Sequence, residues 1–245
     1  GGTMDWAGNY ARVPNMDMIR FQPDYHRVMM DKHHVPYRLG VEATAEMILA
    51  EKPDVVVIAT GADWVLPEVD GLAAALASGY AATIDRAMSR DAAFDPGASP
   101  VVYGAAMGGE LAIDYALGGL KLRFLEPGAQ YRTVNYLGSR GPRVQAFLEA
   151  KGVKVETGRK LVKVGDGEIV VTTPEGGTET IKATKLVLCP DRRPSDGLSA
   201  QLAGKGVEYS VHVPVWDANL TSENPRIREA TAASYRFSIE FAATI

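Results

Sequence analysis

The chain has 245 residues, 46% of them hydrophobic, and a formal net charge of −4. This composition is typical of a globular protein, and acidic and basic residues are intermixed, so we expect neither a nucleic-acid partner nor an anionic membrane surface. Cys189 is the single cysteine, which excludes an internal disulfide and an iron–sulfur cluster ligated wholly by cysteines of this chain.

The sequence also lacks the features of several other classes of protein. It contains no apolar run of membrane-spanning length and no signal-peptide pattern, so we expect a cytoplasmic protein. Its histidines have no metal-ligand spacing with carboxylates or thiols, and we expect no metal site. These histidines are His26, His33, His34 and His212.

The first part of the chain alternates turns, helices and strands. A turn-rich segment over residues 3–22 precedes a predicted helix over 23–32, which has a proline at its start. A short strand at 37–39 and a helix at 43–50 follow. The β-branched run at 53–61 predicts a buried parallel strand in the middle of a sheet.

A linker is expected next. Residues 62–99 are rich in Ala, Asp, Pro and Gly, with one short helix predicted at 83–89. We expect the chain to pass from one domain to another near residue 97.

The most informative stretch begins at Val101. An apolar strand is followed by small residues spaced G-x-A-x-x-G, namely Gly104, Ala106 and Gly109, and then by a helical pattern over 110–117. This is the strand, turn and helix start of a nucleotide-binding βαβ unit. The small residues allow the tight turn, the approach of a pyrophosphate and close helix packing, and the helix start favours a phosphate.

An acidic residue stands where such a unit binds ribose. The strand after the helix, residues 121–126, ends in Glu126, about 20 residues after Gly104. A carboxylate there accepts hydrogen bonds from ribose hydroxyls, which favours NAD over NADP. The alternative is a βαβ unit that binds no phosphate and keeps its glycines for packing.

The rest of the chain predicts a meander and a second buried strand. The meander consists of three antiparallel strands with glycine turns. The expected elements are a helix at 141–151, a strand at 153–156, the meander at 161–164, 168–173 and 179–183, buried and short strands at 185–189 and 212–217, and a closing helix at 226–242.

Several short motifs resemble those of one family. Gly1-Gly2 stands where that family has Gly-Gly after its first adenosine-binding strand, and Ala59-Thr60-Gly61-Ala62 matches its A-T-G-A turn. Asp217 matches the acid of its terminal G-D, and residues 225–231 closely follow its P-R-x-I-x-E-A-T helix start. Nearly the whole chain resembles the C-terminal region of the old-yellow-enzyme-related iron–sulfur flavoproteins, the group of trimethylamine dehydrogenase, histamine dehydrogenase and 2,4-dienoyl-CoA reductase.

This resemblance implies an α/β fold with two Rossmann-like, three-layer domains of the FAD/NAD(P)-binding kind. The FAD- or ADP-binding-type domain would comprise residues 1–96 and 205–245, and the NAD(P)-binding-type domain, with its meander, would be inserted as residues 97–204. The first βα unit of the FAD-type domain is not in the sequence. We expect another polypeptide, or an upstream part of the same gene product, to supply it.

The resemblance also implies cofactors and partners. The chain would bind FAD or ADP through Gly1, Gly2, Ala59, Thr60, Gly61 and Asp217, and NAD(H) through the βαβ unit. FMN and a 4Fe-4S cluster would sit on a (β/α)8 barrel in a partner chain or domain, and an electron-transfer flavoprotein is a further possible partner. No catalytic residue is expected in this chain.

Three departures from the family's pattern favour a second interpretation. Ala106 replaces a glycine, Trp216 replaces the glycine before Asp217, and Cys189-Pro190 stands where a second Thr-Gly turn is usual. Each change crowds a place where backbone should meet a nucleotide. The alternative is therefore a non-catalytic scaffold or interaction subunit with degenerate nucleotide sites.

Overall fold

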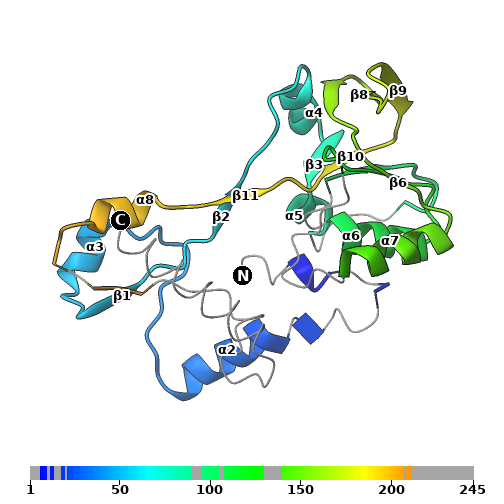
Figure 1. Cartoon of the computed structure of the whole chain (residues 1–245). Coiled ribbons are helices and arrows are strands. Elements are labelled where there is room, and N and C mark those ends of the chain that lie inside the picture. Colours follow the sequence, from blue (N-terminus) through cyan, green and yellow to red (C-terminus); the bar gives the residue numbers. More distant parts are fainter. Residues whose placement is uncertain are drawn as a thin grey trace, which may run out of the picture. The chain divides into compact units, whose positions relative to one another are not determined.

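The computed structural model divides the chain into two compact units (Figure 1). The first unit comprises Gly1–Val35 and Trp64–Asp191, and the second comprises Pro36–Asp63 and Arg192–Ile245. The structure describes residues 6–9, 12–13, 18–19, 21–89, 95–104, 108–129, 140–206 and 208–210. The strand expected at 212–217 and the helix expected at 226–242 lie outside these residues.

The first unit is built on a parallel sheet of five strands. In spatial order these are β3 (Ala81–Thr83), β10 (Leu186–Leu188), β4 (Val101–Tyr103), β5 (Arg123–Leu125) and β6 (Val155–Glu156). All four pairings are parallel. From β4 the chain proceeds to β5 and β6 on one side and returns as β10 on the other, which is the 3-2-1-4 order of a Rossmann half-domain. The α/β fold class expected from the sequence is confirmed.

Helices cover one face of this sheet. Helices α5 (Ile84–Ala87), α6 (Gly108–Leu117) and α7 (Arg140–Ala150) contribute to the core on this face. Side chains alternate along each strand, so Val102 and Phe124 point into this core and are fully buried. The helix predicted at 141–151 corresponds to α7.

An antiparallel meander covers the other face (Figure 1). It consists of β7 (Leu161–Val164), β8 (Glu168–Thr172) and β9 (Thr178–Lys182), and helix α4 (Leu72–Ser78) packs beside it. Val101 and Leu125 point to this side, where they meet the buried Ile169 and Val171. The three predicted meander strands are confirmed, and the unit has three layers.

The expected linker at 62–99 is wrong in its middle part. That stretch contributes α4 to the meander side and β3 to the edge of the sheet, where Ala81 pairs with Leu186. Ala81 is 2% exposed and Leu72 is 4% exposed. The Ala-rich sequence has good helix propensity, but the edge strand forms through its pairing with β10 rather than through a local β preference.

The second unit has fewer described elements. Helix α3 (Ala45–Ala50) starts at Thr44, whose hydroxyl accepts a hydrogen bond from the Met47 backbone at 3.3 Å. Helix α8 (Gly197–Leu202) and the strand β12 (Glu208–Ser210) come from its later segment. Strand β1 (Val55–Val57) pairs in parallel with β12.

Two sequence predictions for this unit are corrected. Of the run at 53–61, residues Val55–Val57 form a parallel strand as expected, but this strand is not fully buried: Val55 is 51% exposed and Val57 is 66% exposed. Val55 and Val57 lie on one face of β1, and within the described residues β1 has one hydrogen-bonded neighbour, β12, whereas a central strand has two. The strand expected at 37–39 is absent, and these residues form bends and irregular backbone.

The chain passes between the units through a pair of short strands that the sequence did not predict. Strands β2 (Ala62–Trp64) and β11 (Arg192–Pro194) form a two-stranded sheet. In the sequence, residues 64–191 of the first unit stand between the two segments that form the second unit, 36–63 and 192–245. The domain limits of 1–96, 97–204 and 205–245 stay a prediction.

Within the first unit, an early segment of the chain packs against the core on the helix side of the sheet. Trp6 and Val13 contact the helix-side core, and the Asn9 side chain donates a hydrogen bond to the Met88 carbonyl at 2.6 Å. Helix α2 (Phe21–Lys32), which was predicted, follows this segment and buries none of its side chains. In the described part of the chain, no helix is long and apolar enough to cross a membrane.

A buried carboxylate fixes this early segment. Asp114 of α6 is 2% exposed, and its two oxygens accept hydrogen bonds from the backbone N–H of Arg12 at 2.7 Å and from the Arg12 guanidinium at 2.9 Å. A buried carboxylate that loses such a partner is costly because it keeps its charge without compensation.

Replacement of Arg12 by Ala should therefore lower the stability of the first unit. We expect a loss of about 1–3 kcal/mol, less than for a fully buried pair because the Arg12 side chain is 30% exposed. Urea unfolding measures it. Arg27→Ala removes an exposed ion pair with Asp24 and should change stability by less than about 0.5 kcal/mol. Equal effects of the two variants would contradict this account.

Candidate nucleotide-binding site

The candidate site lies where the order of strands in the first unit reverses. The chain leaves β4 toward β5 on one side and returns as β10 on the other, so the carboxyl ends of β4 and β10 flank the switch point. In open parallel sheets ligands bind in the crevice outside this point. Gly104 follows β4 and Cys189 follows β10, and the Cys189 N–H donates to the Tyr103 carbonyl at 2.7 Å.

Gly104 is required by the backbone at this point. Its φ is +96°, a backbone conformation that residues with a side chain rarely adopt. A Cβ at this position would lie 2.4 Å from the Cys189 carbonyl oxygen. The Gly104 N–H donates to the Leu125 carbonyl at 2.8 Å, so the turn is tied to both neighbouring strands.

Helix α6 begins in close contact with the sheet. A Cβ on Gly108 would lie 3.1 Å from Phe124 and from Val102, and 3.2 Å from the Cys189 sulfur. Gly109, which the motif singles out, is buried in the same turn of α6. The role of Gly108 was not predicted from the sequence, although the Gly108-Gly109 pair was visible. Ala106 lies outside the described residues.

Cys189 fills the space beside this turn. Its side chain is buried, and burial together with the negative charge of Glu110 raises the pKa of the thiol. The sulfur is therefore a neutral, space-filling group in contact with the start of α6 rather than a reactive thiolate.

Glu126 stands directly after β5, as the sequence predicts. It is 5% exposed, and its Oε1 accepts a hydrogen bond from the Gly128 N–H at 2.8 Å. Its backbone is paired with the chain that follows β6: the Glu126 N–H donates to the Glu156 carbonyl at 2.8 Å, and its carbonyl accepts from the Arg159 N–H at 3.0 Å. Burial, followed by the charge of Glu126, raises the pKa of Tyr103, whose hydroxyl accepts a hydrogen bond from the Leu161 N–H.

These residues fit a dinucleotide. A glycine with positive φ ends the first strand, α6 starts in contact with that strand, and an acid follows the second strand. This is the geometry in which backbone N–H groups at a helix start meet a pyrophosphate and a carboxylate meets ribose hydroxyls. A Cβ at Gly104 would already collide with protein, so the glycine has a packing role as well.

The Ala59-Thr60-Gly61 turn lies in the second unit and is exposed. The Thr60 hydroxyl donates to the Ser195 carbonyl at 2.8 Å, and the Ser195 N–H donates to the Gly61 carbonyl at 3.1 Å. Gly61 has a φ of +84°, with no atom within 4 Å of an added Cβ. The turn is thus tied to the chain after β11. Gly1, Gly2 and Asp217 lie outside the described residues.

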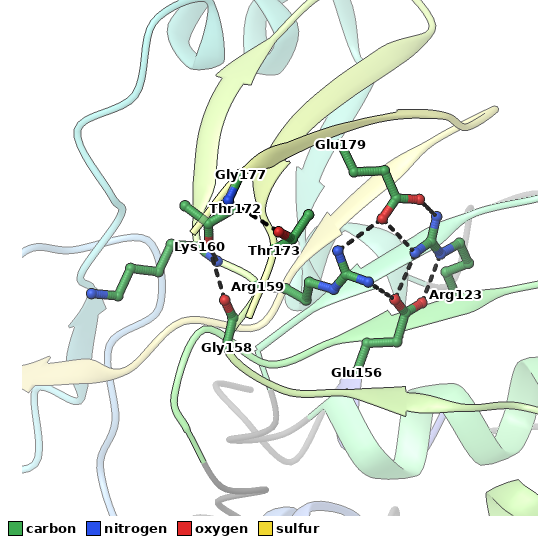
Figure 2. A network of polar contacts seen from close by, with 9 residues as sticks. All are labelled: Arg123, Glu156, Gly158, Arg159, Lys160, Thr172, Thr173, Gly177 and Glu179. Carbon is green, nitrogen blue, oxygen red and sulfur yellow. Dashed lines mark hydrogen bonds and ion pairs between the residues drawn. The ribbon is translucent and has the colours of Figure 1, made fainter. Parts of the chain in front are cut away.

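A cluster of four charged side chains was not predicted from the sequence (Figure 2). Arg123 of β5, Glu156 of β6, Arg159 and Glu179 of β9 form ion pairs with one another. The hydrogen bonds to Glu156 and then to Glu179 raise the pKa of Arg123, and the bond from Arg123 lowers the pKa of Glu179. No local spacing could reveal this ionic cluster, because Arg123, Glu179 and the Glu156–Arg159 segment are far apart in the sequence.

Comparison with known proteins defines the class. The sequence matches the pyridine nucleotide-disulphide oxidoreductase family over residues 11–227, and the chain belongs to this family. NADH oxidase of Thermoanaerobacter brockii is 27% identical over 213 residues, which are 86% of this chain and 32% of the oxidase. The chain thus spans about a third of the length of this relative.

Two solved structures share the fold. A 2-naphthoyl-CoA reductase in complex with 2-naphthoyl-CoA matches 95% of this chain and 34% of its own with a TM-score of 0.66 and 20% identity. Histamine dehydrogenase from Rhizobium sp. 4-9 matches 94% of this chain and 38% of its own with a TM-score of 0.58 and 21% identity. In both, the matched region is a minor part of a longer chain.

Substitutions at the two glycines should destabilise the first unit in a fixed order. Gly104→Ala combines positive φ with a backbone collision and should cost about 3 kcal/mol or more. Gly108→Ala meets side chains that can shift and should cost about 1–3 kcal/mol. Thermal unfolding ranks the variants. Gly177→Ala, at an exposed turn where the new Cβ would make an ordinary contact, is the control and should change little. The reverse order would contradict the close approach of Gly104 to the Cys189 carbonyl.

Proposed function

We propose that the first unit binds NAD(H) in a flavin-dependent oxidoreductase. The proposal rests on the position of Glu126. This largely buried acid directly follows β5, and it lies next to the turn at Gly104 that connects β4 with α6. Membership of the pyridine nucleotide-disulphide oxidoreductase family supports it. When bound, the reduced coenzyme supplies a hydride.

The residues of this chain would bind and orient the coenzyme. Gly104, Ala106 and Gly109 would bring backbone close to the pyrophosphate at the start of α6, and Glu126 would accept hydrogen bonds from the adenosine ribose. We propose no catalytic acid, base or nucleophile in this chain. Cys189 supports this assignment because its thiol is buried and its pKa is raised.

The same site should prefer NAD to NADP. A carboxylate at Glu126 repels the 2′-phosphate of NADP and accepts a hydrogen bond from the 2′-hydroxyl of NAD. Arg159, whose N–H meets the Glu126 carbonyl, has its guanidinium paired with Glu156 and Glu179. These carboxylates also pair with Arg123, so the positive charge of the Arg159 guanidinium is already balanced within this group of side chains.

A second nucleotide, FAD or ADP, would bind at the Ala59-Thr60-Gly61 turn. We propose the Ala59-Thr60-Gly61 turn, Gly1, Gly2 and Asp217 as its contacts. The support is the resemblance of these motifs to the iron–sulfur flavoproteins, together with the fixed geometry of the turn against Ser195.

The partner would be a chain or domain that carries FMN and a 4Fe-4S cluster on a (β/α)8 barrel. The chain covers about a third of the oxidase that it resembles, and the exposed Val55 and Val57 of β1 are suited to contact with further protein. Electrons would pass between NAD(H), or an acceptor such as an electron-transfer flavoprotein, and the substrate site of the barrel. We place the protein in the cytoplasm, where a single unpaired cysteine is usual.

A second candidate function is a scaffold with degenerate nucleotide sites. Two features of Cys189 favour it. Its buried side chain lies against Gly108 at the switch point, and Cys189-Pro190 stands where a Thr-Gly turn is usual in the iron–sulfur flavoproteins. In that case the turn at Gly104 would serve packing alone, and the chain would dock a catalytic partner.

Glu126→Gln separates the two candidates. The amide preserves an acceptor for the Gly128 N–H but removes the charge. We expect NADH binding to the intact protein to weaken about tenfold or more, the size of a hydrogen bond to a charged group, whereas NADPH binding should weaken less or improve. Calorimetric titration measures both.

The matched control is Glu149→Gln on the exposed side of α7, which should change neither affinity. If the intact protein binds no NADH, or if Glu126→Gln weakens neither coenzyme, the NAD(H) site is wrong and the scaffold function is favoured.

A further inference from the structure

The ionic cluster of Arg123, Glu156, Arg159 and Glu179 joins the sheet to the meander (Figure 2). Arg123 binds Glu156 through two hydrogen bonds, of 2.7 Å from Nε and 2.6 Å from Nη2. It also binds Glu179 of β9 through Nη1 at 2.6 Å. Arg159 spans the same two carboxylates, with 2.8 Å to each.

The cluster is closed and electrically balanced. Two guanidinium groups face two carboxylates, and each guanidinium bridges both of them. The Glu156 side chain is 9% exposed and the Arg159 side chain 14%, whereas Arg123 and Glu179 are about one-third exposed. Partly buried, multiply bonded pairs hold their geometry better than isolated surface ion pairs.

The segment that contains Arg159 also forms hydrogen bonds with the meander. The Thr172 hydroxyl of β8 donates to the Gly158 carbonyl at 2.9 Å and accepts from the Lys160 N–H at 2.9 Å. The Thr172 N–H donates to the Lys160 carbonyl at 2.8 Å. Residues 158–160 are therefore fixed through both backbone and side chains (Figure 2).

Residues 158–160 in turn hold the loop at 126–128, which contains Glu126. The Arg159 N–H donates to the Glu126 carbonyl at 3.0 Å, and the Gly158 N–H donates to the Gly128 carbonyl at 2.7 Å. The Gly128 N–H is the donor to the Glu126 carboxylate. Glu179 on the meander thus bonds to Arg159, which bonds to the Glu126 backbone, and the adjacent Gly158 bonds to Gly128, which donates to the Glu126 carboxylate.

We propose that Arg159 and Glu179 are positioning residues for the adenosine-ribose site, through which the meander sets the place of the Glu126 carboxylate. The proposal rests on the proposed NAD(H) function. It gives the meander a role in coenzyme affinity beyond covering the sheet. A carboxylate that binds two hydroxyl groups must be held within a fraction of an ångström, and such precision depends on the residues behind it.

Glu179→Gln tests the proposal in the intact protein. The side chain is about one-third exposed, so we expect the variant to fold. NADH should bind roughly fivefold more weakly, the loss of one ordinary hydrogen bond. Reduced nicotinamide mononucleotide lacks the adenosine ribose, and its dissociation constant should not change. Arg159→Lys keeps the charge but loses the two-carboxylate bridge, and it should show the same selective loss.

A double-mutant cycle separates positioning from general stability. If Glu179 acts through Glu126, Glu179→Gln should add almost nothing in a Glu126→Gln background. Lys163→Gln is the matched control, because Lys163 is an exposed charge on the same meander whose partner, Asp70, lies outside the cluster. It should leave both dissociation constants unchanged.

The possible results are distinguishable. If Glu126→Gln weakens NADH but Glu179→Gln and Arg159→Lys do not, the positioning role is wrong and the NAD(H) site stands. Equal weakening of NADH and reduced nicotinamide mononucleotide, or additive effects in the cycle, would also overturn it. If Glu126→Gln leaves NADH binding unchanged, the ribose site is wrong, and the positioning role fails with it.

Discussion

The contact between Gly104 and the Cys189 carbonyl is the constraint on which the first unit depends. A Cβ at Gly104 would lie 2.4 Å from the Cys189 carbonyl oxygen, so β4 and β10 can lie side by side at their carboxyl ends only with glycine at this position. The same turn directs the chain into α6, whose Gly108 lies against Phe124 and Val102. The buried strands β4 and β10 thus bring a helix start and the switch point of the sheet to one place.

The chemistry of the candidate site follows from this arrangement. Parallel strands bring their carboxyl ends to one edge, so the residue after β5, Glu126, lies on the edge that carries the Gly104 turn. Its carboxylate is held by its own loop, and that loop is held by the segment after β6. The ionic cluster then ties this segment to the meander. The helix layer, the sheet and the meander therefore all contribute to the candidate site at this edge of the sheet.

The sequence predicted those parts whose signals are local. The strand at 101–103, the helix after it, Glu126 at the end of β5 and the three meander strands follow from periodicity and turn residues. The edge strand at Ala81 was missed because alanines carry little β preference and the strand forms through tertiary pairing. Burial of Val55 was wrongly predicted because an apolar run does not reveal what covers it. The ionic cluster joins residues up to 56 positions apart, which no spacing rule detects.

A crystal structure of the intact protein with NADH would show whether the coenzyme binds between the Gly104 turn and Glu126. We expect the pyrophosphate to lie at the start of α6 beside Gly104, and an adenosine-ribose hydroxyl to donate to the Glu126 carboxylate within about 3 Å. NADH bound elsewhere, or an adenosine ribose that makes no contact with Glu126, would contradict the account.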